Sequence, residues 1–591
     1  MKIGDATTTW CIHIHHWNID RRHPRPRMAR QGDSQNAIFK LTFQPDHLVG
    51  PVIWSKRRPA SVSDLLAARG LPAINLVDET AVMGTENEIK FEVTARGLQK
   101  LAATRILQRN DGQPAKHKYV VSTYFDTPKQ KLRQNGVTLR VRKAGKKRLQ
   151  TIKTISDGIS FRRGEWEREL DSNEPDLRSA RGTPLHPLIS KKLKRDLKPI
   201  FATHVHRTFI PLRPRNGSLV ELALDEGDIR AGHKSMTLAE VELELKKGSA
   251  TDLFKAARVI AKLVPFKLAL KSKSQQGYDL IADQPPRCIH APRISLRHDA
   301  DLIEAFQAIG SSVLWHLAAN EPAVVAGDPE GIHQMRIGVR RLRAAISIFA
   351  ELLRSKQTDQ TKRDLKWLSG KLGSVRDLDV FIQTKVKRFD AAELRIPGLP
   401  ELISELVYRR ALAADSTRNA IATARYRLLI FNTLEWIENG DWLKKSRQGD
   451  QQIKPFATHL FERRTSKARK KSKHIGRLDP RRRHKLRIAM KKLHYAIYFF
   501  ESLFVGKRQK TLSRYKERLK SLQDNLGALN DIAVHQKLAT NIAAGKEARA
   551  PNLVAYAVGV VAGSERNDVE PLLINAKKVA HQLRQAKKFW T

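Results

Sequence analysis

Cysteines, aromatic residues and long apolar runs are all scarce in this sequence. It contains two cysteines, Cys11 and Cys288, among 591 residues, and they lie in unrelated regions. This disfavours both a disulfide framework and a cysteine-ligated zinc site. No apolar stretch approaches the roughly eighteen residues of a membrane-spanning helix, and the basic N-terminus lacks the apolar centre of a secretory signal. We therefore expect a soluble, cytoplasmic protein with no membrane partner.

Acidic residues are also in short supply. The chain has 60 Asp and Glu against 109 Lys and Arg, which gives a formal net charge of +49. Residues 291–591 contain 57 of these basic residues and 30 of the acidic ones. Such a surplus attracts polyanions through counterion release and electrostatic steering. Inorganic polyphosphate, nucleic acid and an anionic membrane all meet this requirement on charge alone.

Four segments repeat a pattern in which charged residues stand two positions apart, with apolar or aromatic residues between them. Because side chains on a strand alternate between its two faces, the charged residues of each segment share one face. One such segment alone is typical of a half-buried strand with its charges in solvent. Four together predict a sheet curled on itself, with a charged lumen and an apolar exterior covered by helices. The charged positions are Glu86, Glu88 and Lys90; Arg140 and Arg142; Glu165 and Glu167; and Glu240, Glu242 and Glu244.

The segment 86–280 resembles the CYTH domains, the triphosphate tunnel metalloenzymes, whose signature is an ExExK strand near the domain start. That signature is ENEIK at 86–90 in this chain. A lone ExExK is weak evidence, but here an ordered series of motifs follows it. The resemblance implies an antiparallel β-barrel tunnel at 84–282. The later motifs are YFDT at 124–127, NGVTLRVR at 135–142, QTIK at 150–153, RGEWE at 163–167, THVHRT at 203–208, LALDEGDIRAG at 222–232 and EVELELKKG at 240–248.

The resemblance also implies a role for each charged position. Glutamates that converge in a lumen are hard oxygen ligands suited to Mg²⁺ or Mn²⁺, and arginine forks match phosphate oxygens. The implied metal ligands are Glu86, Glu88, Glu242 and Glu244, with Asp225 and Glu240 in support. The implied catalytic residues are Lys90, Arg140, Arg142, Lys153, Arg207 and Lys271, with Glu165 and Glu167 at further acidic positions of the family. For two of these residues a non-functional interpretation stays open: Lys271 could be an ordinary surface lysine, and Asp225 a turn residue beside Gly227.

The implied reaction is hydrolysis of inorganic triphosphate to pyrophosphate and phosphate. Metal ions would polarise the terminal phosphoryl group while cations take up charge on the transferred group. Two alternatives stay open. The same tunnel could act on thiamine triphosphate or a nucleoside triphosphate, or cyclise ATP, although no base-recognition pocket is obvious. The protein could instead be a non-catalytic scaffold that binds polyphosphate, against which the intact charged motifs argue.

The second half of the chain contains an internal repeat. HQMRIGVRRLRAAISIF at 333–349 aligns without gaps on HKLRIAMKKLHYAIYFF at 484–500, and residues 365–380 align on 519–534. Each first segment has an apolar stripe at helical spacing, which predicts an amphipathic helix. The repeat resembles the CHAD domain, a helical domain that commonly follows CYTH in one chain. This resemblance covers about 295–591 and implies polyphosphate binding.

Each repeat copy also carries a basic face. A basic run on one helix is usually a solvated surface, but duplication with the His-x-x-Arg spacing kept favours a binding role. Two such faces turned toward each other predict a basic groove without acidic neighbours. Aromatics make up only 6% of the chain, and single-stranded nucleic-acid sites usually add aromatic platforms, so polyphosphate is the better candidate and nucleic acid stays open. The candidates are His333, Arg336, Arg340 and Arg343 in one copy, His484, Arg487, Lys491 and His494 in the other, and the flanking Arg341 and Lys492.

These features predict an α+β protein with a tunnel domain at 84–282, a Pro-rich linker at 283–294 and an all-helical basic bundle at 295–591. Residues 1–82 match neither domain and show no sustained period. We expect them to be a disordered extension, or the result of a start site assigned too far upstream.

Overall fold

The computed structural model describes residues 82–591, except for 105–114, 155–161, 215, 392–394, 445–450, 505, 507 and 546–549, and the side chains of 82–86, 162–163 and 390–391. Ala81–Thr591 form one compact unit. Before this unit four short strands are assigned in two antiparallel pairs: β1 (Lys2–Asp5) with β2 (Thr8–Cys11), and β3 (Asn36–Phe39) with β4 (Val52–Ser55). The rest of the predicted extension 1–82 lies outside the described residues.

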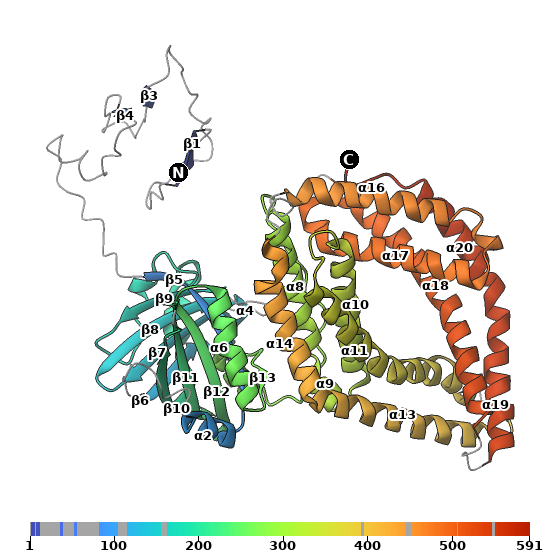
Figure 1. The fold of residues 1–591 in the computed structure, drawn as a ribbon, viewed down its shortest axis with the longest axis horizontal. Helices are drawn as coiled ribbons and strands as arrows, with labels where there is room; N and C mark the ends of the chain where they lie inside the picture. The colour runs from blue at the N-terminus through green and yellow to red at the C-terminus, as the bar shows by residue number, and fades with distance from the viewer. Residues whose placement is uncertain are drawn as a thin grey trace. The chain divides into compact units, whose positions relative to one another are not determined.

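The first half of the compact unit is an antiparallel sheet of nine strands, in the order β12-β11-β10-β6-β7-β8-β9-β5-β13 (Figure 1). Tight turns connect neighbouring strands: Gly145 and Gly232 adopt positive φ values of 62° and 60° in two-residue hairpin loops, a conformation that glycine reaches without strain. The strands are β5 (Val82–Glu92), β6 (Lys116–Asp126), β7 (Val137–Ala144), β8 (Lys147–Thr154), β9 (Arg162–Glu169), β10 (Lys198–Leu212), β11 (Leu219–Ala231), β12 (Lys234–Lys247) and β13 (Lys267–Leu268).

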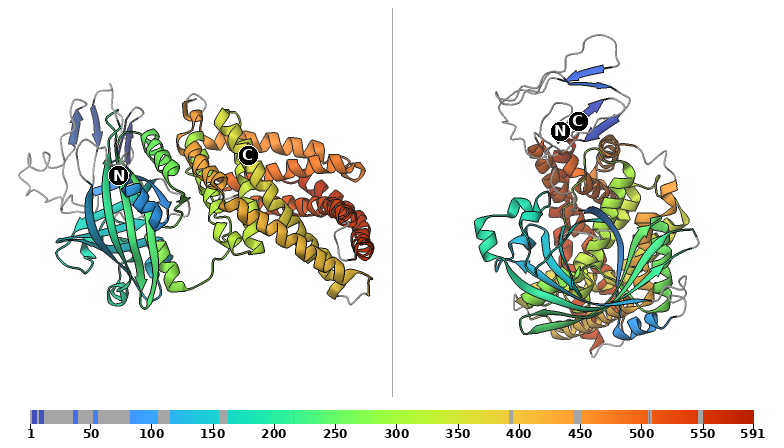
Figure 2. Two further views of the ribbon diagram at one scale, coloured as in Figure 1. Left: turned by 60° about the horizontal axis from the view of Figure 1, so that its bottom comes forward. Right: turned by 90° about the vertical axis from the view of Figure 1, so that its left-hand side faces the viewer.

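Strand β5 has different partners along its length. Its first half, from Val82 to Asn87, pairs with β9, and its second half, from Glu88 to Glu92, pairs with β12. The sheet therefore curves far enough for the first strand of the order, β12, to meet β5, and this curvature is visible in Figure 2. The predicted antiparallel sheet is confirmed, and a fully closed tunnel stays a prediction.

The apolar face of this sheet is covered by helices, as the alternating pattern predicts. Ile89, Phe91, Val241 and Leu243 are buried in one core with residues of α6 (Ala250–Leu263). The helix begins at a capping box in which Ser249 and Asp252 satisfy each other's backbone N–H groups. Four shorter helices complete this half: α2 (Ala95–Ala102), α4 (Lys131–Gln134), α5 (Lys191–Asp196) and α7 (Lys273–Ala282).

Residues 284–297 contain neither helix nor strand, and the predicted linker 283–294 falls almost entirely within this stretch. The remainder of the chain is helical, which confirms the predicted fold class. Among the described residues, no helix has the length and apolar character needed to cross a membrane. The main helices are α8 (Leu302–Ala318), α9 (Glu321–Val325), α10 (Pro329–Ile348), α11 (Lys356–Phe381), α12 (Lys387–Ala391), α13 (Leu399–Ala422), α14 (Ala424–Asn439), α16 (Ile453–Lys471), α17 (Pro480–Phe500), α18 (Gln509–Ala543), α19 (Pro551–Ser564) and α20 (Val569–Arg584).

The two copies of the repeat form corresponding helices. Both α10 and α17 begin with an Asp-Pro pair, in which Asp328 or Asp479 caps the helix and proline occupies the first turn, where its missing N–H costs nothing. The predicted apolar stripes, such as Met335 in α10 and Met490 in α17, are buried. Each helix packs on the next long helix of its own copy, α11 or α18, and α10 also contacts α17.

Candidate functional site

The strand register places the predicted tunnel residues on one face of the sheet. Residues paired directly across an antiparallel ladder point their side chains to the same side. On β5 and β12, Lys90 is paired with Glu242, and Glu88 with Glu244. The same face continues across the sheet through the pairs Glu240–Asp225, Asp225–Arg207, Tyr124–Arg140, Arg140–Thr151, Thr151–Glu167 and Lys153–Glu165.

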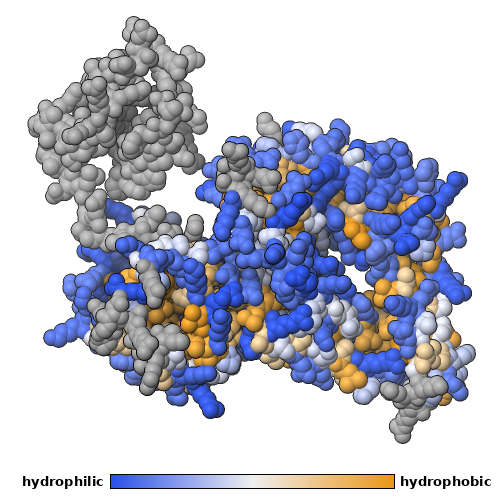
Figure 3. Space-filling model, viewed as in Figure 1, coloured by the Kyte–Doolittle hydropathy of each residue, from blue (hydrophilic) through white to orange (hydrophobic). Residues whose placement is uncertain are grey.

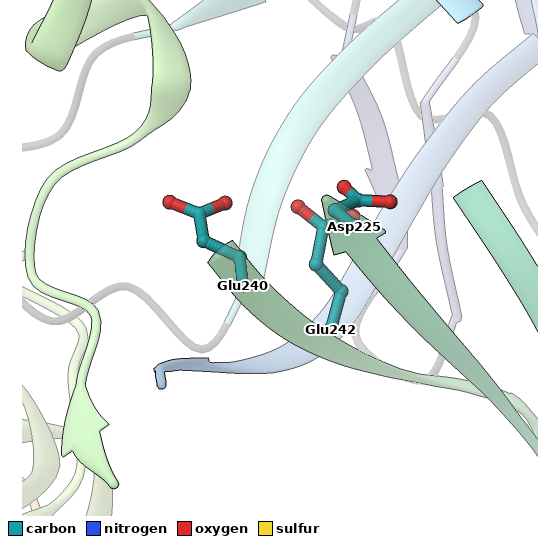
Figure 4. A group of neighbouring side chains, drawn as sticks. All are labelled: Asp225, Glu240 and Glu242. Carbon is teal, nitrogen blue, oxygen red and sulfur yellow. The ribbon is translucent and has the colours of Figure 1, made fainter. Parts of the chain in front are cut away.

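Three carboxylates cluster on this face. One oxygen from each of Asp225, Glu240 and Glu242 lies within 4.8 Å of the others. Figure 4 shows that Glu240 and Glu242 extend from one strand and Asp225 from its neighbour. Asp225 and Glu240 are almost completely buried, so three negative charges gather where little water can screen them. Such a cluster needs cations nearby.

Two cationic side chains bind this cluster directly. Nζ of Lys273 lies 2.8 Å from Asp225, 2.5 Å from Glu240 and 2.7 Å from Glu242. Arg207 donates to both oxygens of Asp225 at 2.5 Å and to Glu242 at 2.6 Å. Burial alone would raise the pKa of Asp225 and of Glu242, but these cations outweigh it and hold both pKa values below the ordinary carboxyl range. Asp225 and Glu242 are therefore ionised at neutral pH.

Lys90 connects the cluster to the first strand. Its ammonium group lies 2.9 Å from both Glu88 and Glu242. Glu88 also faces Glu244 directly across the ladder, an arrangement of like charges that destabilises a sheet unless a cation lies between or beside them. Glu244 is paired with Lys246 at 2.6 Å. The ExExK strand and the ELEL strand therefore form one acidic surface.

The donor set of this surface fits a hard divalent cation. It offers several carboxylate oxygens and no sulfur, and clustered carboxylates are the ligands preferred by Mg²⁺ and Mn²⁺. Both oxygens of Asp225 and of Glu242 already contact Arg207, Lys273 or Lys90, so an ion would bind beside these cations or in place of one of them. Asp225, Glu240 and Glu242 are the residues that would hold it, with Glu88 and Glu244 on the adjoining positions.

The opposite part of the same face is basic. Nε and Nη2 of Arg140 are buried and make no hydrogen bond within the described part of the chain, although Nη2 lies 3.5 Å from Glu165 in an ion pair. Lys153 reaches the same glutamate at 2.9 Å. Arg140, followed by burial and Arg207, lowers the pKa of Arg142 to about 10. Several guanidinium groups thus lie close together, and unsatisfied N–H donors are suited to phosphate oxygens.

Three predicted residues of the tunnel stand apart from this surface or have other partners. Lys271 is half exposed and forms an ion pair with Asp279 at 2.7 Å. Glu167 accepts a hydrogen bond from Thr151 at 2.9 Å. Glu86 is placed on β5 by its pairing with Arg163, and its side chain lies outside the described residues.

The basic faces of the repeat helices lie next to each other. Burial, followed by Arg487 of the same helix and Arg340 of the other copy, lowers the pKa of Lys491 to about 7. Burial and the neighbouring Lys516 likewise lower the pKa of His494 to about 4. Arg340 of α10 acts on both Lys491 and Arg487 of α17, and the two helices are in contact, so the two copies form one cationic surface.

This surface holds buried polar atoms without a hydrogen-bond partner. Nδ1 of His333, Nε of Arg340 and Nε of Arg487 are buried, and none has a hydrogen-bond partner among residues that the structure describes. Buried polar groups are normally paired, and exceptions need an explanation such as a bound ion. Donors from both copies therefore await an acceptor. Figure 3 shows hydrophilic residues over much of the visible surface of the helical half.

The predicted absence of acidic neighbours is wrong. Arg336 donates to Asp377 at 3.0 Å and to the Gly373 carbonyl at 3.2 Å, and Asp531 lies near enough to Arg487 to favour its charged form. Residues 377 and 531 are equivalent in the repeat alignment, so each copy supplies one carboxylate from its second helix. Asp377 holds part of the Arg336 side chain in place, because α11 packs beside α10.

The four other candidates of the basic faces lie in different environments. Arg341 is buried in the core, where it donates to Tyr498 and contacts His316, both at 3.1 Å. Lys492 is exposed beside Arg464 and Lys467 of α16, and Arg343 is also exposed. His484 contacts Asn530 at 3.0 Å. Helical periodicity separates neighbouring positions by about 100°, so residues next to the basic face in sequence turn away from it.

Two family models match the two halves of the compact unit. The CYTH domain family matches residues 84–278, and the CHAD domain family matches residues 308–540. The chain contains a CYTH domain followed by a CHAD domain. An inorganic triphosphatase of Haemophilus influenzae is 30% identical over 211 residues, which are 34% of this chain and 57% of the relative.

Two solved structures are each similar to about half of this chain. The CHAD domain from the plant Ricinus communis has 27% identity and a TM-score of 0.45, and covers 51% of this chain and 99% of its own. PptA from Streptomyces chartreusis has 16% identity and a TM-score of 0.37, and covers 48% of this chain and all of its own.

Sequence reasoning missed two residues of the CYTH site. Lys273 and Gln276 both bind Glu240, at 2.5 Å and 2.6 Å. They lie in the first turn of α7, whose start is fixed by a capping box between Ser272 and Gln275. The signal was available in the sequence, because SxxQ before a helix predicts where it begins. The strand period does not extend into that helix, and Lys271, which the resemblance implies, forms its ion pair with Asp279.

Proposed function

We propose that the CYTH domain is a metal-dependent inorganic triphosphatase that uses Mg²⁺ or Mn²⁺. The observation that carries this proposal is one sheet face with a carboxylate cluster at Asp225, Glu240 and Glu242 and unsatisfied guanidinium donors at Arg140. A triphosphate chain needs both: anionic ligands for its metal ions and cations for its oxygens. The similarity to the Haemophilus influenzae inorganic triphosphatase supports the same activity.

The basic residues of this site have two proposed roles. Arg140, Arg142 and Lys153 would bind and align the phosphates, with the arginine forks each contacting two oxygens. Arg207 and Lys273 keep the carboxylates ionised and in place. The metal, when bound, polarises a phosphoryl group and makes a bound water more acidic. Because the donors are held in position before substrate arrives, they stabilise the developing charge without reorganising.

We further propose that the CHAD domain binds inorganic polyphosphate along the paired faces of α10 and α17. Buried donors from both copies, on Arg340 and Arg487, support a ligand that is long, anionic and rich in acceptors. The ligand would bridge the repeat copies and satisfy those donors. Aromatic residues make up only 6% of the chain, which favours polyphosphate over a ligand whose bases stack on aromatic side chains.

Phosphate release from a panel of substrates tests the proposed activity. Tripolyphosphate, thiamine triphosphate and ATP are each incubated with Mg²⁺, with Mn²⁺ and with a chelator. We expect metal-dependent release to be fastest with tripolyphosphate and to stop with the chelator. Faster phosphate release from thiamine triphosphate or ATP would make that compound the better substrate. No release from any of the three would favour a non-catalytic binding protein.

A further inference from the structure

The CHAD domain packs against the back of a strand that carries part of the candidate active site. On β5, Glu88 and Lys90 occupy the charged face, whereas Phe91 occupies the other face and is fully buried. The ring of Phe431, on α14 of the CHAD domain, meets Phe91 with 5.7 Å between centroids. A contact between the domains therefore lies directly behind Lys90.

Phe431 completes a cluster of four phenylalanine rings. The other three come from the CYTH domain: Phe91 and Phe266 are 4.7 Å apart, and Phe431 lies 5.8 Å from Phe266 and 6.2 Å from Phe254. Their tilted and edge-to-face geometries are favourable for aromatic rings. The cluster belongs to a single hydrophobic core that runs through both domains.

Polar contacts surround this cluster. Arg258 of α6 contacts Glu435 and donates to Asn432 at 3.1 Å, and Thr251 donates to Asn439 at 2.8 Å. All three partners lie on α14, the helix that carries Phe431. Such contacts fix how α14 lies along α6 and β13, its neighbours in Figure 1.

A series of charged residues also connects the interface to the carboxylate cluster. Lys267 of β13 pairs with Glu321 of the CHAD domain at 2.7 Å and faces Glu92 across the ladder. Glu92 in turn faces Glu240 of the cluster. Burial, then Glu240, raises the pKa of Glu92. One ion pair and two strand pairings thus connect a CHAD carboxylate to the site.

We propose that Phe431 is a positioning residue for the CYTH active site, through which α14 of the CHAD domain holds β5 so that Glu88 and Lys90 stay beside Glu242. Closely packed interiors relax only partly around a deleted side chain, so a cavity behind Phe91 shifts the strand. A displacement of about 1 Å in a catalytic group can cost about 100-fold in rate. The activity part of this proposal rests on the proposed triphosphatase function.

The full-length Phe431→Ala variant tests the proposal against Phe381→Ala. Phe381 is an equally buried phenylalanine of the CHAD domain, but its core contains no CYTH residue. We expect Phe431→Ala to lower kcat for tripolyphosphate at least tenfold and to speed amide hydrogen exchange in the peptide 82–92. Phe381→Ala should leave both unchanged, and Phe431→Leu, which refills much of the space, should restore most of the rate.

The two readouts separate this inference from the proposed function. If the wild type releases no phosphate, the triphosphatase proposal fails, while faster exchange in 82–92 for Phe431→Ala still supports the positioning role. If Phe431→Ala does not fold, Phe431→Leu takes its place and should show smaller changes in the same direction. Unchanged exchange and turnover in a folded Phe431 variant, or equal losses in Phe381→Ala, would overturn the inference.

Discussion

The two candidate sites both gather cations, but they differ in how the charge is balanced. On the CYTH face, Arg207, Lys273 and Lys90 each contact two or more carboxylates at 2.5–2.9 Å. On the CHAD face, burial and the neighbouring Arg487 and Arg340 lower the pKa of Lys491 to about 7. A balanced network holds groups in fixed positions, which suits catalysis, whereas an unbalanced one attracts and releases a polyanion.

The largest effect is expected at the carboxylate cluster. Glu242→Gln keeps the side-chain shape but removes a charge that Lys90, Arg207 and Lys273 share. Because metal polarisation contributes several kcal/mol to such reactions, we expect turnover to fall about 100-fold or more. Phosphate release at saturating Mg²⁺ measures this, and Glu226→Gln, an exposed residue on the other face of β11, is the matched control. Wild-type turnover in Glu242→Gln would exclude the metal assignment.

The CHAD face should respond to salt instead. Replacing Arg340 and Arg487 together by Gln removes two cations with unsatisfied donors. Each neutralised contact to a phosphate polymer lowers the salt slope of log K by roughly 0.7 to 0.9, so we expect a slope smaller by about 1.5. Titration of long-chain polyphosphate at several salt concentrations gives the slopes. Lys577 and Lys578, exposed together on α20, form the control pair; an equal change there would indicate diffuse charge.

A smaller effect should appear with pH. The pKa of Lys491 is about 7 in the folded protein, so the side chain gains its proton as the pH falls from 8.5 to 6.5. A bound polyanion stabilises the protonated form, and polyphosphate affinity should therefore rise as the pH falls, by up to about tenfold for each unit of pKa change on binding. Calorimetry at both pH values measures this. The Lys491→Met variant should lose this part of the pH dependence of the affinity. If its pH dependence equals that of the wild type, Lys491 does not belong to the polyphosphate-binding surface.

The smallest expected effect compares the repeat copies. Asp328 caps α10 by accepting from the Glu330 N–H, and Asp479 caps α17 by accepting from the Arg482 N–H. Replacement of either by Ala should lower the free energy of unfolding by about 1 kcal/mol, which denaturant unfolding can measure. Both variants should keep their polyphosphate affinity, because the cap acts on helix stability and not on the basic face. A loss of affinity in one variant alone would show that the copies contribute unequally.

Much of the CYTH site could be predicted because strand periodicity is strict. Charges two residues apart, such as Glu240 and Glu242, do share a face, and pairing across the ladder brings Lys90 to Glu242. The period could not identify Lys273, which reaches the cluster from a helix after the last motif. It also could not show which carboxylate each cation binds, since that depends on the curvature of the sheet.

The CHAD face was predicted less completely, for a physical reason. Alignment of the repeats identified the basic positions on α10 and α17, but a helix turns about 100° per residue. Arg341 therefore enters the core beside Tyr498, one position from Arg340. The acidic partners Asp377 and Asp531 come from the following helices, and sequence spacing does not show how closely those helices pack.

The sequence by itself determined the order of the domains, the charged face of the sheet and the duplicated helices, because these follow from local periods of two and 3.6 residues. Only the tertiary structure decided that Lys273 binds three carboxylates, that Arg341 is a core residue and that Phe431 packs behind Lys90. These contacts join residues distant in sequence, and their geometry depends on how whole strands and helices pack together.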